Sequence, residues 1–444
     1  MTVQNSIRFP DQRSPEVMAK RAWWLVALNL LIPGSAQLLA GDRRLGRFAV
    51  STTFVFWLLG LVGFVLFGVA KSVFLTLATN PVALTVVQVL LVGYAVLWLV
   101  LAVDTLRLVR LVRLGPAMRM AVAVLATAGL ILVVGTAGYG AVLAGAARGV
   151  LVEVFGGGDY ADPIDGRYNI MLLGGDAGPD RIGLRPDSIS VVSIDAATGA
   201  ATIIGIPRNL ALTPFSAGSP LYGPYPQGYN CGNDCLISYL YTYGEEHPEL
   251  YPDAEKDGSN PGVEAMRDAV EGTTGLTMQY FALIDMQGFS DLIDALGGIT
   301  ITVPEKVVLG KNGDAPIGAI AAGVQTMDGP TALWYARSRY NTTDYARMER
   351  QRQVQEAILA QFEPTNVVTK FQGIATAGSQ VVKTDIPQSM LPLFVELVQK
   401  TRALPLTKLE LVPPEIVTHD PDYDLIRSLV VEAVSPRPSA TPTR

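Results

Sequence analysis

Hydrophobic positions follow two different patterns along this chain. Before residue 150 they form long runs, and those at about residues 48–70, 82–103 and 121–147 each match the roughly 20 helical residues that cross a hydrocarbon core. After residue 166, short apolar runs alternate with polar turns and with segments of helical periodicity. The pattern predicts an all-α transmembrane module over residues 23–147, followed by a soluble domain.

The first apolar segment of the module, residues 23–40, is interrupted by Pro33 and Gly34. Non-helical backbone at membrane depth must be buried against protein, so we expect a re-entrant or interfacial hairpin here, with a fourth crossing as the alternative. The links at residues 41–47 and 104–120 carry three and four arginines, whereas 71–81 carries one lysine. Because basic links stay inside, residues 1–22 are expected in the cytoplasm. The predicted location is the cytoplasmic membrane, multi-pass, with the C-terminal domain extracytoplasmic.

The soluble domain is expected to span residues 167–433, between a glycine-rich linker at 148–166 and a disordered Pro/Ser/Thr-rich tail at 434–444. Its first strands are predicted at 169–173, 188–194 and 201–206. Further strands are expected at 278–284, 299–303 and 409–412, and helices at 235–243, 261–272, 288–296 and 388–401. This alternation predicts an α/β fold, a three-layer α-β-α domain with a mixed central sheet.

The arrangement of the first three strands predicts which polar residues meet. If the second and third strands form a hairpin, Asp187 and Arg208 lie at the same edge of the sheet. If the first strand runs antiparallel beside the second, Asp176 and the loop with Arg181 and Arg185 reach that edge too. Asp176 and Asp187 could together hold a divalent cation such as Mg²⁺, which prefers oxygen ligands. The alternative is that each aspartate caps a turn or pairs with an arginine.

Charge is divided unevenly between the two parts of the chain. Residues 1–150 carry 13 Lys+Arg and 4 Asp+Glu, whereas the remainder has a net charge of −15. An acidic domain argues against nucleic acid as a ligand, because duplex binding requires broad neutralisation of phosphates.

Residues 336–359 nevertheless contain five arginines within sixteen positions. From Asp344 onward the spacing is helical and runs from charged to apolar along one face. The segment is either a solvated helix with charge pairs or a polyanion site, since guanidinium groups bind phosphate oxygens bidentately. Arg352 lies off this face and is expected to be a surface charge. The predicted face consists of Asp344, Arg347, Gln351, Val354 and Ile358.

Residues 210–260 are rich in Pro, Gly, Tyr and Asn and contain the chain's two cysteines, Cys231 and Cys235. With no histidine nearby, a C-x3-C spacing is a poor zinc site, so we expect a disulfide in an oxidising compartment, with two free buried cysteines as the alternative. The tyrosines either pack and form hydrogen bonds or provide an apolar lip for a lipid tail. His247 and His419 lie outside the motifs, which makes a histidine base improbable.

Four collinear motifs between Tyr168 and Phe362 resemble the LytR-CpsA-Psr family of cell-envelope glycan ligases. They are NIMLLGGD, RPDSISVVSID, TIIGIPRNL and MDGPTALWYARSRYNTTDYARMERQRQVQEAIL. The resemblance implies a domain that binds polyprenyl (pyro)phosphate with magnesium. It also implies transfer of a lipid-linked glycan polymer onto peptidoglycan or a related cell-wall acceptor at the outer face of the membrane.

The resemblance also assigns roles to residues. It implies Asp176 and Asp187 as the positions associated with the metal. The phosphate-binding residues that we expect are Arg181, Arg185, Arg208, Arg337, Arg339, Arg347, Arg350 and Gln351. Those expected to be catalytic are Asp176, Arg185, Arg208, Arg337, Arg339 and Asp344. Two positions depart from the pattern: Asn209 stands where many members have aspartate, and Pro186 replaces a small polar residue.

The working hypothesis is an arginine clamp on the diphosphate, with the polyprenyl chain between the sheet and the helices. An acceptor hydroxyl completes transfer of a glycosyl-phosphate, and Asp176 or Asp344 is the candidate base. Two alternatives stay open: a polyprenyl-pyrophosphate hydrolase, and a non-catalytic regulatory protein that binds polyprenyl phosphate.

Overall fold

The computed structural model describes residues 7–8, 10–11, 14–155, 160–175, 185–232, 234–310, 313, 315–361 and 382–435. The chain forms two compact units, Met1–Arg148 and Gly149–Arg444.

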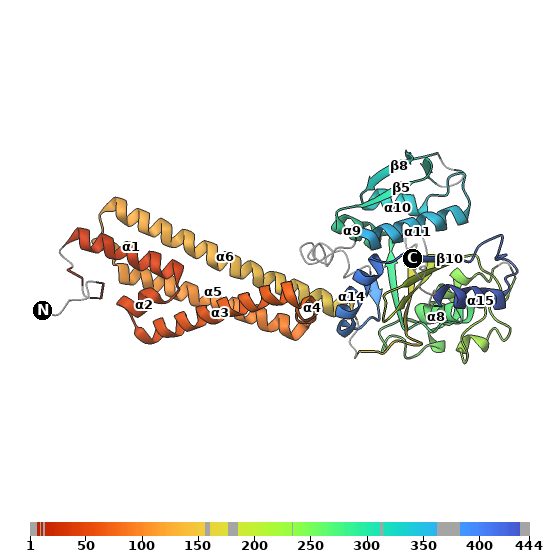
Figure 1. Cartoon of the computed structure of the whole chain (residues 1–444), viewed down its shortest axis with the longest axis horizontal. Coiled ribbons are helices and arrows are strands. Elements are labelled where there is room, and N and C mark those ends of the chain that lie inside the picture. Colours follow the sequence, from red (N-terminus) through yellow and green to blue (C-terminus); the bar gives the residue numbers. More distant parts are fainter. Residues whose placement is uncertain are drawn as a thin grey trace, which may run out of the picture. The chain divides into compact units, whose positions relative to one another are not determined.

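The first unit is helical. Its helices are α1 (Pro15–Leu31), α2 (Ser35–Ala40), α3 (Arg43–Val69), α4 (Lys71–Ala78), α5 (Pro81–Val109), the 3-10 turn η1 (Leu111–Arg113) and most of α6 (Pro116–Val154) (Figure 1). In the described part of the chain, three helical stretches are long and apolar enough to cross a membrane: Arg43–Val69, Pro81–Arg113 and Pro116–Gly149. They coincide with the three predicted runs and indicate membrane anchoring. The short helix α4 lies in the link between the first two of them.

The predicted break in residues 23–40 is present as the turn between α1 and α2. Gly34 adopts φ 94°, and a Cβ there would lie 2.5 Å from the Cβ of Ala49. Its amide donates to the Asn29 side chain at 3.1 Å. Because only glycine combines this backbone conformation with so close a contact, the sequence Pro33-Gly34 dictates a helical hairpin. Whether the hairpin enters a membrane stays a prediction.

The second unit contains a six-stranded sheet in the order β10-β3-β2-β1-β4-β9. Strands β1, β2 and β3 form an antiparallel set, whereas β4 is parallel to β1 and β10 is parallel to β3. Both the mixed sheet and the β2–β3 hairpin are therefore confirmed. The strands are β1 (Arg167–Gly175), β2 (Pro186–Asp195), β3 (Ala201–Ile206), β4 (Tyr280–Asp285), β9 (Val382–Thr384) and β10 (Thr407–Glu410).

Alternating residues of these strands serve two different cores. Met171, Ile189 and Ile204 pack with α8 (Pro261–Thr274) and α15 (Tyr423–Val434), together with residues 210–251. Ile170 and Ile194 pack on the opposite face with α14 (Leu391–Arg402). Helices on both faces of the sheet confirm the three-layer α-β-α architecture (Figure 1). The Asn260 side chain caps α8 by accepting from the amide of Val263.

A smaller lobe lies beside the six-stranded sheet. It comprises α9 (Met286–Leu296), α10 (Gly329–Arg337), α11 (Asp344–Gln361) and two separate two-stranded sheets. These pair β5 (Ile299–Val303) with β8 (Gly323–Met327), and β6 (Val307–Leu309) with β7 (Gly318–Ile320). Helix α10 was not predicted, because Asp328-Gly329-Pro330 looks like a turn. In the structure the Asp328 side chain caps α10 by accepting from the Thr331 amide at 2.9 Å.

We expect Gly329→Ala to destabilise this lobe. A Cβ at Gly329 would lie 2.0 Å from the backbone carbonyl oxygen of Ser290 in α9, so the two helices would have to separate. Overpacking of this kind costs about 1–3 kcal/mol of unfolding free energy, measurable as a lower thermal midpoint. Gly318→Ala, where the added Cβ makes only ordinary contact, is the matched control. Equal midpoints for the two variants would contradict this expectation.

Candidate functional site

The site begins where β1 ends, β2 begins and β3 ends. Register places Gly175 opposite Pro186, and Ile189 opposite Ile206, so Asp187 and Arg208 come to one edge. Arg208 Nη1 forms a short hydrogen bond to Asp187 Oδ1. This confirms the predicted proximity of Asp187 and Arg208.

The start of α11 completes the cluster. Arg208 Nε donates to Asp344 Oδ2 at 3.0 Å, and Arg339 Nη1 lies 3.4 Å from Asp344 Oδ1. Arg347 lies 3.6 Å from Asp187 Oδ2 and 3.8 Å from Asp344 Oδ2. These five residues, here called the arginine–aspartate cluster, join segments far apart in the sequence and carry one more positive than negative charge.

Arg347 is the most enclosed member of the cluster. It is 2% exposed, and its Nε has no hydrogen-bond partner among the described residues. Burial, followed by the charge of Arg208, lowers its pKa, although Asp344 and Asp187 oppose that shift. For Arg208, burial alone would lower the pKa, but Asp187 and Asp344 raise it above the ordinary value. The cluster therefore contains a buried guanidinium with unused capacity to donate to an anion.

Two further predicted arginines stack on aromatic rings near the cluster. Arg185 directly precedes β2, and its guanidinium lies 5.1 Å from the centroid of the Tyr239 ring. Arg337 lies 5.0 Å from the centroid of the Trp334 ring. Arg337 is the last residue of α10 and not part of a loop or strand. A cation is favoured there by the partial negative charge of the helix C-terminus.

Arg350 and Arg352 point to different partners. Arg350 Nε donates to the carbonyl of Tyr335 at 2.9 Å, and its Nη2 donates to the carbonyl of Ser338. It therefore holds the bend between α10 and α11. The prediction that Arg352 is a surface charge is wrong. It is 6% exposed and binds Glu410 of β10 at 2.7 Å, because α11 also packs against that edge of the sheet.

Two predicted residues, Asp176 and Arg181, lie outside the described residues. Asn209, the departure noted in the sequence, donates to Thr418 Oγ1 at 3.3 Å. This contact ties the end of β3 to the segment before α15.

An apolar cavity of about 320 Å³ adjoins the cluster. Its walls are the β1 and β4 side of the sheet and the helices α9, α10 and α11, which confirms the predicted apolar space between sheet and helices. Gln351, Val354 and Ile358 line it, as the helical face of the sequence predicted. Asp187 and Arg337 line it as well, so the cavity and the charged cluster meet at Asp187.

Asp285 and Gln355 also line the cavity, and the sequence reasoning missed both. Asp285 ends β4 beside Gly175 of β1 and caps α9 by accepting from the Gly288 amide at 2.8 Å. An aspartate between a predicted strand and a predicted helix is the signal that could have found it. Gln355 donates to Ser190 Oγ at 3.1 Å and was hidden because only the Gln351 face of α11 was considered.

The donor set for a metal is small in the described part of the chain. No group of three or more His, Cys, Asp or Glu side chains lies there in a metal-binding arrangement. Asp187 offers one carboxylate, whose two oxygens face Arg208 and Arg347. One or two carboxylates suffice for Mg²⁺ when substrate phosphates and water supply the other ligands. The cluster thus fits a metal shared with a phosphate substrate.

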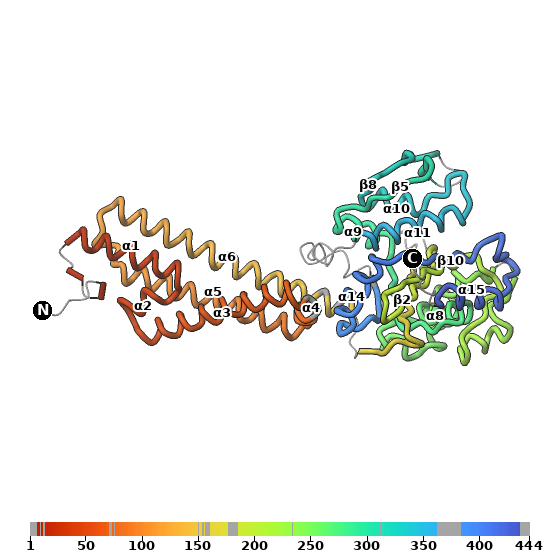
Figure 2. The backbone as a smooth tube through the Cα atoms, in the orientation of Figure 1, coloured from red at the N-terminus to blue at the C-terminus, as the bar shows by residue number. Residues whose placement is uncertain are grey.

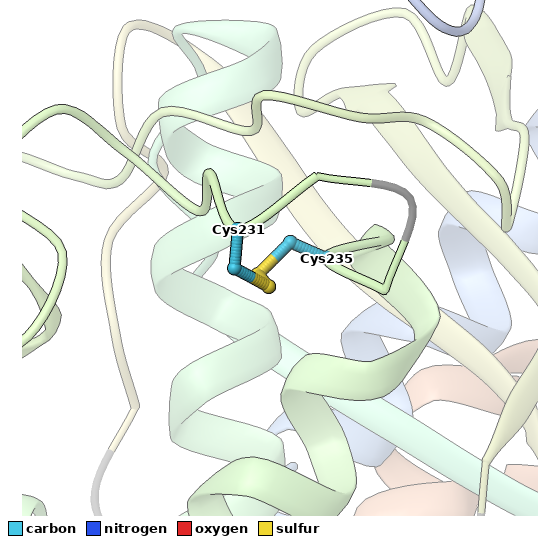
Figure 3. Close-up of a disulfide and its surroundings, with 2 residues drawn as sticks. All are labelled: Cys231 and Cys235. Atoms are coloured by element: carbon cyan, nitrogen blue, oxygen red, sulfur yellow. A yellow bond between two sulfur atoms is a disulfide. The ribbon is translucent and has the colours of Figure 1, made fainter.

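The structure joins Cys231 and Cys235 in a disulfide, with the two Cα atoms 5.2 Å apart (Figure 3). Cys235 is buried in the hydrophobic core, together with other residues of the segment 210–251.

The pKa of Asp344 predicts how the stability of the folded protein depends on pH. Burial alone would raise its pKa, but Arg347, Arg208 and Arg339 lower it below its ordinary value. Its stabilising contribution is therefore complete above the unfolded pKa of about 3.9 and is lost as the pH falls through the lower folded pKa. We expect the thermal midpoints of wild type and Asp344→Asn to differ by a constant amount from about pH 7 to about pH 5 and to converge below about pH 4. A difference that persists at about pH 2 would contradict this.

The second unit is thus a three-layer domain with a cationic cluster at one sheet edge and an apolar cavity beside it. The chain belongs to the LytR_cpsA_psr family, whose family model matches residues 159–413.

Named relatives share part of their length with this chain. A polyisoprenyl-teichoic acid–peptidoglycan teichoic acid transferase, TagU, of Enterococcus faecalis is 29% identical over 49% of this chain and 61% of its own length. The cell wall biosynthesis protein LcpA of Corynebacterium glutamicum is 28% identical over 58% of this chain and 52% of its own length. The solved LytR-Csp2A-Psr enzyme from Actinomyces oris covers 64% of this chain and 96% of its own, with 21% identity and a TM-score of 0.44.

Proposed function

We propose that this protein transfers a polyprenyl-pyrophosphate-linked glycan polymer onto peptidoglycan or a related cell-wall acceptor. The observation that carries the proposal is the junction of the apolar cavity with the arginine–aspartate cluster at Asp187, with Arg337 also in the cavity wall. A polyprenyl pyrophosphate has the same division into apolar tail and charged head. The name of the Enterococcus faecalis relative supports a transferase that acts on such a lipid-linked polymer.

The donor binds with its tail in the cavity and its diphosphate against the arginines. Arg208, Arg339 and Arg347 already lie within 4 Å of cluster carboxylates, and a diphosphate would replace part of those pairings. Arg185 and Arg337 extend the positive surface. Arg350 acts indirectly, because it binds the carbonyls of Tyr335 and Ser338 and thereby fixes the segment that carries Arg337 and Arg339.

In the proposed step, an acceptor hydroxyl oxygen attacks the phosphorus that carries the glycan. The new oxygen–phosphorus bond forms as the bond to the bridging oxygen breaks, and polyprenyl phosphate leaves with that oxygen. Arginines beside the bridging oxygen neutralise its growing charge, which is commonly the largest catalytic contribution. The hydroxyl proton passes to Asp176, the other candidate base from the sequence. With a lowered pKa, Asp344 is a weak base, so its role here is to position Arg208, Arg339 and Arg347.

Mg²⁺ is the proposed cofactor. Asp187 would hold it, together with Asp176 from the adjoining segment and oxygens of the diphosphate. When bound, the metal supplies further charge neutralisation on the phosphates. Removal with EDTA is expected to weaken diphosphate binding, with recovery on addition of MgCl₂.

The three apolar helices support a multi-pass location in the cytoplasmic membrane. The arginine-rich links at residues 41–47 and 104–120 support an extracytoplasmic position for the second unit, where membrane lipid carries the donor and the wall supplies the acceptor. Protease accessibility of that unit in spheroplasts tests the orientation. A protected unit would contradict it.

The decisive experiment incubates the full-length protein with a radiolabelled polyprenyl-pyrophosphate-linked glycan and purified peptidoglycan. Covalent attachment of label to peptidoglycan is the expected result. Release of glycan phosphate into water at the same rate with and without peptidoglycan would instead identify a hydrolase. Binding without any product would identify a regulatory protein that holds the lipid.

A further inference from the structure

The segment from Leu210 to Tyr251 begins two residues after Arg208, yet its composition differs sharply from that of the cluster. It contains no lysine or arginine, and its ionised side chains are carboxylates such as Asp234, Glu245 and Glu246. A neutral-to-acidic surface repels phosphate-rich polymers and favours an uncharged ligand. Its tyrosines are Tyr222, Tyr225, Tyr229, Tyr239, Tyr241, Tyr243 and Tyr251.

A backbone hydrogen bond attaches this segment directly to the cluster, since the amide of Ser238 donates to the carbonyl of Arg208 at 3.2 Å. Beside it, within the segment, the amide of Ile237 donates to the carbonyl of Leu210 at 2.9 Å. The ring of the next residue, Tyr239, lies against Arg185. The segment packs with α8 in one hydrophobic core (Figure 2). None of its tyrosines is among the residues that line the cavity.

Several rings of the segment touch one another. The Tyr225 centroid lies 4.9 Å from that of Tyr229 and 5.4 Å from that of Tyr243, which in turn lies 4.3 Å from the His247 ring. Tyr229 is buried, whereas Tyr225, Tyr243 and His247 are half-buried and keep part of their rings in solvent. His247 also pairs with Glu249 at 3.0 Å. Aromatic faces beside hydroxyl and carboxylate groups are suited to the apolar faces and hydroxyls of sugars.

The disulfide and a set of hydrogen bonds fix the backbone that carries these rings. The disulfide closes the chain between Tyr229 and Tyr239, with Cys235 anchored in the core (Figure 3). Asp268 of α8 accepts hydrogen bonds from Ser216 Oγ, Ser219 Oγ and Tyr251 OH, the last at 2.6 Å. A preorganised surface loses little conformational entropy when it binds a ligand.

We propose that Tyr225, Tyr243 and His247 bind the uncharged sugar backbone of the acceptor. The proposal rests on the function proposed above. In phosphoryl transfer the attacking and leaving oxygens lie roughly in line through the phosphorus. The tail of the leaving polyprenyl phosphate lies in the cavity, so the acceptor hydroxyl approaches the phosphorus from the side away from the cavity. The tyrosine segment is outside the cavity lining, yet it is bonded to Arg208 and stacked on Arg185.

The test is equilibrium binding by titration calorimetry with the full-length protein in detergent. The probes are chitotetraose as an uncharged acceptor backbone, farnesyl diphosphate as a sugar-free donor, and farnesyl-diphosphate-linked N-acetylglucosamine. We expect Tyr225→Ala and Tyr243→Ala each to weaken chitotetraose binding about tenfold, because each removes a stacking ring. Tyr243→Phe keeps its ring and should remain near wild type. Tyr160→Ala, at an exposed tyrosine outside the segment, is the matched control.

The outcomes separate the possibilities. Unchanged binding of both farnesyl probes by the alanine variants, with weaker chitotetraose binding, supports the acceptor surface. Weakening confined to the sugar-bearing farnesyl probe would place the donor's sugar there and overturn the proposal. Equal weakening of farnesyl diphosphate would show a structural role only, and also overturn it. If chitotetraose binding depends on the tyrosines but the protein transfers no glycan, the sugar-binding surface is supported and the proposed transferase function is contradicted.

Discussion

Arg208→Ala is expected to reduce glycan transfer by about 10²–10³-fold, the loss typical of one well-placed electrostatic donor. Arg208 binds both carboxylates of the cluster, through Nη1 to Asp187 and through Nε to Asp344. Its removal deletes one phosphate donor and also one of the two arginines, with Arg347, that pair with both carboxylates. Arg208→Lys keeps the charge but loses the bidentate fork, so it should lie between wild type and alanine.

The measurement is the initial rate of label transfer to peptidoglycan, with the thermal midpoint recorded for each variant. Arg402→Ala, on the exposed surface of α14, is the matched control and should transfer normally. Near-normal transfer by Arg208→Ala would contradict the hypothesis that the arginines bind and neutralise the diphosphate.

Ala282→Trp is expected to weaken binding of a long-chain polyprenyl phosphate by about 100-fold, because the indole would fill the cavity between the sheet and α9–α11. Ala282 lines that cavity from β4. Each buried CH₂ contributes about 0.8 kcal/mol, so excluding about four of them costs about 3 kcal/mol. Inorganic diphosphate, which has no tail, should bind this variant as it binds wild type.

Ala319→Trp makes the same change at an exposed position of β7 and serves as the control. Affinities are compared in detergent by titration with the long-chain lipid and with inorganic diphosphate. Equal loss for both ligands would show that the indole distorts the cluster rather than occupying the cavity. No loss for the long-chain lipid would place the tail elsewhere.

The two predictions together divide the donor between two parts of one site. Arg208 tests the charged head of the donor and Ala282 tests its tail. Arg208 lies two residues after the end of β3, whereas Ala282 lies within β4 of the same sheet. If both expectations hold, a variant with both changes should lose binding roughly as the sum of the two free energies, because head and tail contacts are separate.

Much of the fold follows from local rules in the sequence. The long apolar runs gave the three candidate membrane helices, and Pro33-Gly34 gave the hairpin before them. Alternation and turn residues gave β1, β2 and β3, and a hairpin of that length brings Asp187 to Arg208 without further information. These features depend on residues close together in the chain or on strand register, which is why pattern alone determined them.

Only the tertiary structure decided the roles of the other arginines. Helical spacing correctly placed Arg347 and Gln351 toward the site, but it could not foresee that Arg352 meets Glu410, 58 residues later, across a second contact of the same helix. Nor could it show that Arg350 binds backbone carbonyls rather than facing the anion. Arginine has the same charge and reach in every case. The partner of each guanidinium depends on which distant element packs beside the helix. Local periodicity in the sequence carries no information about packing between distant elements.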